Sequence, residues 1–308
     1  MKSIIIGNGI DIQYGGYSER GNQAILKRAI HNIECGKYAE LGWNKADVKD
    51  VFDVCVSVIN KVIMNDVYIP TEEDYLFLQM EMERVRRCYK NTIAINEIGM
   101  EDIFLGAEIL YLNARSHEER EMVRTAIHEY LQPVLLDAIY DDGKVNEVYK
   151  NFPDSLVQYL KSYDAIFTLN YDTNIEQAIG TEVPVYHLHG CFSDFSKRAD
   201  IVDDKYKHMY CNGIMTWYWL EKYEEEGADE RYGLSVFNKI KGNIDILGIS
   251  PCNDEQLYIR MWQNRELRTC NYFYYDRQEA VEIRKHIKGT LEGHVTDRDV
   301  KKFWARFK

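Results

Sequence analysis

The feature of this chain that most constrains its fold is a set of five short apolar segments. One opens the sequence at residues 3–7, and the others lie at residues 165–169, 183–188, 244–248 and 271–275. Apolar runs of this length are typical of buried strands. Helical patterns separate several of them, and strands that alternate with helices form parallel sheets with right-handed crossovers. We therefore predict an α/β fold built on a doubly wound, mostly parallel, Rossmann-like sheet.

The long stretch between the first and second of these segments has the pattern of helices. Apolar residues recur at i, i+3, i+4 and i+7 over residues 48–62 and again over residues 122–135, which places them in a stripe along one side of a helix. A large helical insertion therefore interrupts the sheet after its first strand. We predict a Rossmann-like domain from residues 1–16 and 153–290, a helical insertion over residues 17–152, and a C-terminal helix over residues 291–308.

Charge and cysteine content argue against several classes of protein. The formal net charge is −12, from 38 basic and 50 acidic residues, and this balance disfavours direct binding of nucleic acid, whose phosphates attract Lys and Arg. The seven cysteines include no C-x-x-C pair, so the sequence indicates neither a disulfide framework nor a four-cysteine zinc site. No apolar run approaches the roughly 20 residues that span a bilayer, and the opening run is shorter than a signal peptide requires. We expect a cytoplasmic protein that contacts neither nucleic acid nor membrane.

Four of the predicted strands end in turns that contain glycine or polar side chains. Ligands of open α/β sheets bind beyond the carboxyl ends of the strands, so these turns are where a functional site is expected. They are Gly7-Asn8-Gly9-Ile10-Asp11, Asn170-Tyr171-Asp172, His187-Leu188-His189-Gly190 and Gly248-Ile249-Ser250.

The first turn has two interpretations. Gly7 and Gly9 match the glycine pair of a dinucleotide-binding turn, but Ile12 stands where the third glycine of that pattern belongs. Under the functional interpretation, backbone N–H groups at the start of a helix bind a pyrophosphate and the Asn8 side chain adds a donor. Under the structural interpretation, the segment is a buried strand that ends in a turn.

The second and third turns carry side chains suited to proton transfer and hydrogen bonding. The amide of Asn170 can both donate and accept, which suits holding a ribose hydroxyl and a water, whereas Asp172 or Thr173 can also cap the following helix. His187 is readily explained as a core histidine whose hydrogen bonds are satisfied. His189 is the better candidate for proton transfer, because imidazole titrates near neutral pH. We predict no metal site, because no H-E-x-x-H motif or cysteine set accompanies the two histidines.

Taken together and in this order, the four turns resemble the sirtuin-like superfamily. The resemblance is to its zinc-free bacterial branch of phage-defence proteins, which includes the abortive-infection AbiH type. I-I-G-N-G-I-D resembles the nucleotide turn of that branch, T-L-N-Y-D its T-x-N-[YI]-D motif, H-L-H-G its histidine–glycine motif, and L-G-I-S its late G-x-S turn. These motifs cover the sheet half of the chain and leave the helical insertion unassigned.

The resemblance implies a role for each matched residue. Gly7, Asn8 and Gly9 would contact the cofactor phosphates, Asn170 and Asp172 would face the nicotinamide ribose, and His189 would be the catalytic base. The implied catalytic set is Asn170, Asp172 and His189. The implied cofactor contacts are Gly7, Asn8, Gly9, Asp11, Tyr171, His187, Gly190, Gly248 and Ser250.

The function implied by the resemblance is cleavage of NAD+ to nicotinamide and ADP-ribose, with NAD+ as the substrate and no metal. Zinc-dependent protein deacylation is disfavoured because the four-cysteine module of sirtuins is missing from the sequence. In phage defence, such an NAD+ glycohydrolase would deplete the host cofactor. The competing interpretation is a regulatory module that binds NAD+ or a related nucleotide without cutting it and controls a partner protein. For either function we expect a homo-oligomer or a partner from a defence system.

Overall fold

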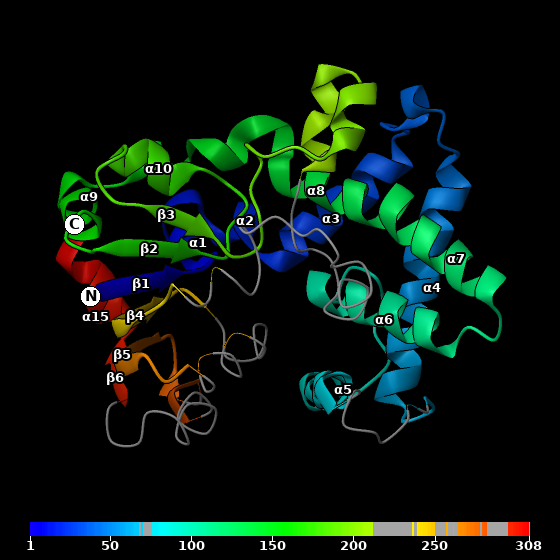
Figure 1. Ribbon diagram of the computed structural model, residues 1–308. Helices are drawn as coiled ribbons and strands as arrows, with labels where there is room; N and C mark the ends of the chain where they lie inside the picture. The colour runs from blue at the N-terminus through cyan, green and yellow to red at the C-terminus, as the bar shows by residue number, and fades with distance from the viewer. Residues whose placement is uncertain are drawn as a thin grey trace. The chain divides into compact units, whose positions relative to one another are not determined.

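A six-stranded sheet with every strand parallel to its neighbours organises the sheet half of the protein (Figure 1). Its strand order is β3-β2-β1-β4-β5-β6, which is the order of a doubly wound Rossmann fold. The predicted fold class is therefore confirmed. The strands are β1 (Lys2–Ile6), β2 (Ala165–Thr168), β3 (Val185–His187), β4 (Gly242–Leu247), β5 (Leu267–Tyr274) and β6 (Val295–Asp299).

This computed structural model describes most of the chain. The described residues are 1–67, 69, 76–211, 236, 239–249, 257, 261, 264–277, 279–281 and 295–307.

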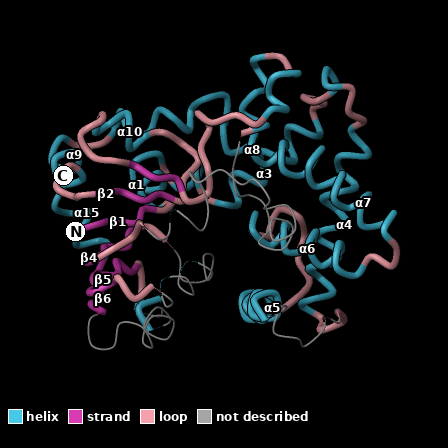
Figure 2. Tube along the Cα trace, in the orientation of Figure 1, coloured by secondary structure: helices cyan, strands magenta, loops and turns pink. Residues whose placement is uncertain are grey.

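The chain divides into two compact units. The sheet unit consists of Met1–Arg20, Asp142–Ile201 and Cys211–Lys308, and the helical unit consists of Gly21–Asp141 and Val202–Tyr210. The helical insertion thus begins and ends inside the predicted range of 17–152, and it recruits a second segment that follows β3. Figure 2 shows the contrast between the sheet unit, with its strands, and the helical unit.

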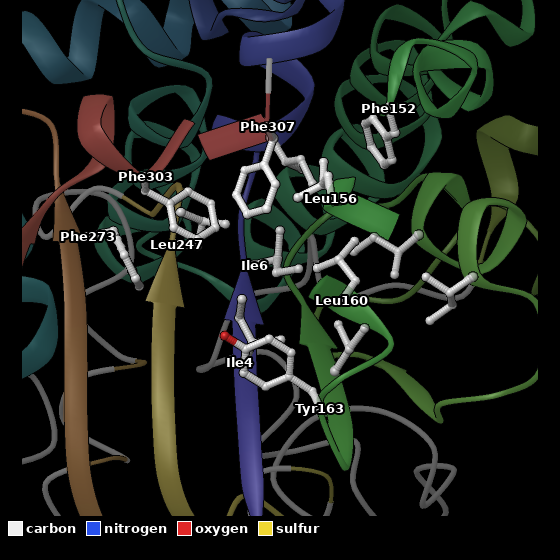
Figure 3. Close-up of a cluster of buried hydrophobic side chains, with 14 of the residues drawn as sticks. Ile4, Ile6, Phe152, Leu156, Leu160, Tyr163, Leu247, Phe273, Phe303 and Phe307 are labelled. Atoms are coloured by element: carbon white, nitrogen blue, oxygen red, sulfur yellow. The ribbon is translucent and has the colours of Figure 1, made fainter. Parts of the chain in front are cut away.

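The alternation of side chains along β1 explains how the sheet is buried on both faces. Ile4 and Ile6 belong to one hydrophobic cluster and Ile5 to another, and all three are fully buried, as expected where successive side chains of a strand point to opposite faces. In Figure 3, Ile4 and Ile6 pack with Leu160 and Phe307 from the helices that cover one face. The helices of the sheet unit are α1 (Gly9–Gly15), α2 (Tyr17–Arg20), α9 (Asp154–Leu160), α10 (Asn174–Ile179) and α15 (Val300–Trp304).

The prediction of a helix over residues 291–308 is wrong for its first described part. Residues Val295–Asp299 form β6, the edge strand, which pairs with β5. The segment VTDRD is polar because an edge strand has a neighbour on one side only and faces solvent, so it lacks the apolar run by which the other strands are recognised. The helix begins one residue later, where Oδ1 of Asp299 accepts a hydrogen bond from the Lys301 N–H over 2.8 Å.

Of the two apolar stripes that the sequence predicts in the helical unit, the first is confirmed and the second is buried only in part. Met122 is 59% exposed, whereas Ile127, Leu131, Val134 and Leu135 are buried. Along α4, residues Val48, Phe52, Cys55, Ile59 and Val62 are buried, so the predicted stripe over residues 48–62 is confirmed. The helices of this unit are α3 (Asn22–Glu34), α4 (Lys45–Ile63), α5 (Leu76–Cys88), α6 (Met100–Asn113), α7 (His117–Ala126) and α8 (Gln132–Tyr140), with a π-helical turn (Ile127–Leu131) between the last two.

The segment Val202–Tyr210 joins the helical unit through a buried carboxylate. Asp137 of α8 accepts hydrogen bonds from Asn32, Tyr38 and the Nε2 atom of His208, the last over 2.8 Å. The ring of His208 also stacks on Tyr140, with 4.1 Å between ring centroids. Because these contacts link residues far apart in the sequence, no local pattern indicates that the segment belongs to this unit.

Candidate functional site

The strand register brings the four predicted turns to one edge of the sheet. Ile6, the last residue of β1, pairs with Thr168 of β2 on one side and with Leu247 of β4 on the other, and Thr168 pairs with His187 of β3. The turns that follow these residues therefore start side by side. The strand order reverses between β1 and β4, and this switch point is where doubly wound sheets bind ligands.

The turns after β1 and β4 are in van der Waals contact through their glycines. A Cβ atom added to Gly9 would lie 2.4 Å from the Cα of Gly248, and one added to Gly7 would lie 2.7 Å from the Gly248 carbonyl oxygen. Gly248 itself has a φ of 70°, in the left-handed region that favours glycine. Close backbone packing thus accounts for all three glycines without a ligand.

The hydrogen bonds of the first turn are made within the protein. The N–H of Gly7 donates to the Leu247 carbonyl and the N–H of Gly9 to the Gly248 carbonyl, each over 2.9 Å. The side-chain amide of Asn8 donates to the Arg20 carbonyl over 2.8 Å. In this conformation these three groups are not available to a pyrophosphate, which corrects the expectation that the turn presents them as free donors.

Two buried carboxyls, Asp11 in the turn after β1 and Asp172 in the turn after β2, are hydrogen-bonded to each other. Their exposed fractions are 2% and 4%. The Nδ2 atoms of Asn170 and Asn174 donate to the two oxygens of Asp11 over 2.6 and 3.1 Å. Oδ1 of Asp172 accepts from the Asn174 N–H over 2.9 Å, so Asp172 caps the start of α10. Both carboxyls are held by partners inside the protein, and their predicted contact with a ligand stays a prediction.

The two carboxyls differ in how readily they ionise. Burial and the negative charge of Asp172 raise the pKa of Asp11 well above its usual 3.8. Burial also raises the pKa of Asp172, but the hydrogen bond that it accepts from Asp11 acts in the opposite direction. The pair therefore retains one proton, carried by Asp11, as is expected of two carboxyls too close to be ionised together.

Asn170 is fixed from several sides, and one hydrogen-bond acceptor of its side chain remains. Its N–H donates to Oγ1 of Thr168 over 3.0 Å, its carbonyl accepts from His187 over 2.8 Å, and its Nδ2 is bonded to Asp11. Among the described residues, the side-chain oxygen Oδ1 receives no hydrogen bond. Asn170 therefore presents a rigidly held acceptor.

His187 is a satisfied core histidine, as the structural interpretation of the sequence has it. It is buried, and its Nε2 atom lies 2.6 Å from Oε1 of Glu176. Burial alone would lower the pKa of His187, but the hydrogen bond and the charge of Glu176 raise it above 6.5. Both ring nitrogens of His187 already have protein partners, so neither is free for the predicted contact with a cofactor.

His189 has a different environment. It is half-buried, its ring centroid lies 6.5 Å from that of Tyr171, and within the described part of the chain its ring nitrogens make no hydrogen bond. Burial lowers its pKa from 6.5 to about 4, so the imidazole is neutral at pH 7 and able to accept a proton. The neighbouring Gly190 has a φ of 79° and turns the chain away after the histidine.

Several residues that support this site are not predicted from the sequence. Asn174 is fully buried and hydrogen-bonds to Asp11. Glu176, in the first turn of α10, hydrogen-bonds to His187. Arg20 is also buried, and its positive charge lowers the pKa of Asp11 against the effect of burial. One signal existed for Asn174: asparagine is a poor helix former, so its place in the first turn of a helix suggests a side-chain role. Nothing local marks Glu176 or Arg20.

Ser250, predicted as a cofactor contact, lies outside the described residues. Across the described ranges, no group of three or more His, Cys, Asp or Glu side chains is arranged to hold a metal ion. Nor does any helix there combine the length and apolar character needed to cross a membrane. Comparison of the chain with protein-family models, curated proteins and solved structures gave no match.

Proposed function

We propose that this protein is an NAD+ glycohydrolase, which splits NAD+ into nicotinamide and ADP-ribose. The observation that carries the proposal is a pair of hydrogen-bond acceptors, Oδ1 of Asn170 and the neutral imidazole of His189, on turns that begin side by side at the carboxyl edge of a 3-2-1-4-5-6 sheet. The sequence resemblance to the sirtuin-like phage-defence branch supplies the identity of the substrate.

The chemistry asks for the kind of groups found on these turns. The bond between the ribose C1′ and the nicotinamide nitrogen breaks, and its electron pair leaves with nicotinamide through a cation-like transition state. The oxygen of a water then bonds to C1′, and the water loses a proton. Asn170 accepts a hydrogen bond from that water or from a ribose hydroxyl, which orients it. His189 is neutral at pH 7, so a ring nitrogen can take up the released proton, and the lowered pKa then favours passing that proton to solvent.

The fit is better for the nicotinamide ribose than for the phosphates. Asn170 and His189 have free acceptor atoms among the described residues, whereas the N–H groups of Gly7 and Gly9 are bonded to the last residue of β4 and to the turn after it. A donor for the pyrophosphate therefore has to come from elsewhere in the chain or from a rearrangement of the first turn. This asymmetry favours a site built for the ribose end of the substrate.

The test is release of nicotinamide from NAD+ by the purified protein, measured beside His189→Ala and Asn170→Ala. His117→Ala is the matched control, since His117 is exposed on α7 in the helical unit. We expect release by the wild type and the control and loss of most activity in the two site variants, with melting temperatures showing that each variant is folded. Full activity in either site variant would refute the assignment of that residue.

The competing function, a binding module that controls a partner, gives a different result in the same experiment. It predicts no nicotinamide release but a rise in melting temperature when NAD+ is added. No release and no thermal shift would reject both functions and leave only the fold.

The proposed cellular role is depletion of NAD+ during phage infection, and it rests on the resemblance alone. Its test is the NAD+ content of bacteria that express the protein, with and without phage, compared with cells that express the His189→Ala variant. Light scattering of the purified protein tests the expected homo-oligomer. A monomer at all working concentrations would leave a partner protein as the remaining expectation.

A further inference from the structure

Two residues that take no part in the proposed reaction, His187 and Glu176, form a chain of hydrogen bonds that ends at Asn170. His187 stands at the end of β3 and Glu176 in the first turn of α10. Nδ1 of His187 lies 2.8 Å from the Asn170 carbonyl oxygen, and Nε2 lies 2.6 Å from Oε1 of Glu176. The imidazole thus bridges a strand, a helix and the turn that carries Asn170.

Hydrogen-bond chemistry assigns the protons of this bridge. A backbone carbonyl can only accept, so Nδ1 of His187 must carry a proton. An ionised carboxylate can also only accept, so beside Glu176 the Nε2 atom carries a proton as well, and the ring is a charged imidazolium. Its two carboxylate neighbours, Glu176 and Asp172, both favour the charged form.

We propose that the Glu176–His187 ion pair is a positioning device for Asn170, holding its main-chain carbonyl so that the side chain stays where the substrate needs it. This inference rests on the proposed function. The remaining hydrogen bonds of Asn170 are made to Thr168 and Asp11, so His187 ties Asn170 itself to β3, the strand that leads to His189. It thereby couples the two turns that carry the proposed reacting groups. A backbone hydrogen bond from the Phe192 N–H to the Tyr171 carbonyl also joins the two turns.

The reason such a link matters is the sensitivity of catalysis to geometry. Displacing an orienting group by about 1 Å can cost on the order of 100-fold in rate. The Asn170 turn follows β2 directly. Without the hydrogen bond from His187, the peptide group of Asn170 can rotate, and this movement displaces the side chain attached to the neighbouring Cα atom. Removing the donor therefore lowers kcat more than it changes KM.

Two substitutions of His187 separate the bond to Asn170 from the bond to Glu176. In His187→Asn the amide nitrogen takes the place of Nδ1, so it keeps the bond to the Asn170 carbonyl and loses the bond to Glu176. In His187→Gln the longer side chain reaches the place of Nε2, so it keeps the Glu176 bond and loses the other. Each variant gives up one of two bonds, so similar melting temperatures are expected for both.

We expect His187→Gln to lower kcat for nicotinamide release on the order of 100-fold with little change in KM, and His187→Asn to stay within about tenfold of the wild type. Equal losses in both variants, or losses that follow melting temperature instead of the Asn170 bond, would overturn the inference. A purely structural histidine has no reason to distinguish the two.

A second measurement is independent of the proposed activity. In the NMR spectrum, the side-chain NH₂ of Asn170, identified by its disappearance in Asn170→Ala, is expected to shift in His187→Gln and to stay in place in His187→Asn. Histidine ¹⁵N signals at pH 7 are expected to show both nitrogens of His187 protonated, and Glu176→Gln is expected to remove that imidazolium signal. An unmoved Asn170 amide in both His187 variants would reject the positioning role, whereas inactivity of the wild type would reject only the proposed function.

Discussion

Replacing Asp172 by asparagine should stabilise the protein, because it removes the conflict between two buried carboxyls. Oδ1 of Asp172 accepts from the Asn174 N–H, and the asparagine oxygen keeps that bond. The new NH₂ group then faces Asp11. The negative charge of Asp172 is thereby replaced by a group that donates a hydrogen bond to Asp11. Asp11 then ionises more readily, because the charge of Asp172 no longer opposes it and its oxygens receive hydrogen bonds from three amides, those of Asn170, Asn174 and the new residue.

The magnitude follows from the proton held by the pair. Above pH 3.8 an unfolded aspartate is ionised, while the folded protein keeps a proton on Asp11, whose pKa is raised by burial and by Asp172. The folded state then binds one proton more than the unfolded state, so the free energy of unfolding falls by about 1.4 kcal/mol per pH unit as the pH rises. The fall stops at the folded-state pKa of Asp11. Asp172→Asn removes the part of this term that comes from the charge of Asp172, whereas the part that comes from burial of Asp11 remains.

Urea denaturation of the wild type and of Asp172→Asn, at pH steps from about 4.5 to 8, measures the effect. We expect the stability difference to grow in favour of the variant as the pH rises, by at most about 1.4 kcal/mol per pH unit, and then to level off. Other titrating groups are common to both proteins and cancel in the difference. A difference that is independent of pH would refute the shared proton. Nicotinamide release by the same variant then decides whether Asp172 also acts on the substrate.

Asp11→Asn is the matched control for this experiment. Both oxygens of Asp11 accept hydrogen bonds from amide groups. In Asp11→Asn an NH₂ group takes the place of one of these oxygens and faces another donor, so at least one of the two hydrogen bonds is lost. We expect this variant to be destabilised by about 1–3 kcal/mol, the usual cost of an unsatisfied buried polar group. If Asp11→Asn were the more stable of the two variants, the two amide hydrogen bonds assigned to the oxygens of Asp11 would be wrong.

Three further perturbations test other parts of the structure. His189 takes up a proton near pH 6.5 in the unfolded chain but only near pH 4 in the folded protein. Lowering the pH from 6.5 to 4 should therefore reduce the free energy of unfolding of the wild type by up to about 3 kcal/mol more than that of His189→Gln. Urea denaturation at the two pH values measures this, and equal losses in both proteins would contradict the lowered pKa. Gly9→Ala should destabilise by about 1–3 kcal/mol or more, because the new Cβ would lie 2.4 Å from the Gly248 Cα, and a variant as stable as the wild type would show that the two turns are not in contact. Phe303→Ala should lower the free energy of unfolding by about 3–5 kcal/mol, because this residue of α15 is 2% exposed and its ring centroid lies 4.6 Å from that of Phe273. A loss under about 1 kcal/mol would mean that α15 does not pack against the sheet.

The sequence by itself determined five of the six strands of the sheet and the helical character of the insertion. Alternate burial of Ile4, Ile5 and Ile6 on two faces, and the stripe along residues 48–62, are properties of strand and helix geometry that need no partner to be recognised. The location of the candidate site follows from the same information, because parallel strands bring their carboxyl ends to one edge. The edge strand β6 was missed because its polar residues carry no apolar signal.

Only the tertiary structure decided what each polar residue of the site does. Gly7 and Gly9 matched a phosphate-binding pattern, yet their N–H groups donate to the carbonyls of Leu247 and Gly248, more than 200 residues away in the sequence. His187 and His189 are separated by one residue, yet one is tied to Glu176 and the other has a free ring among the described residues. A polar side chain has many potential partners of equal chemistry, and the folded backbone alone selects among them. The residue types at the strand ends are therefore a property of the sequence, whereas their bonds and their protons are a property of the fold.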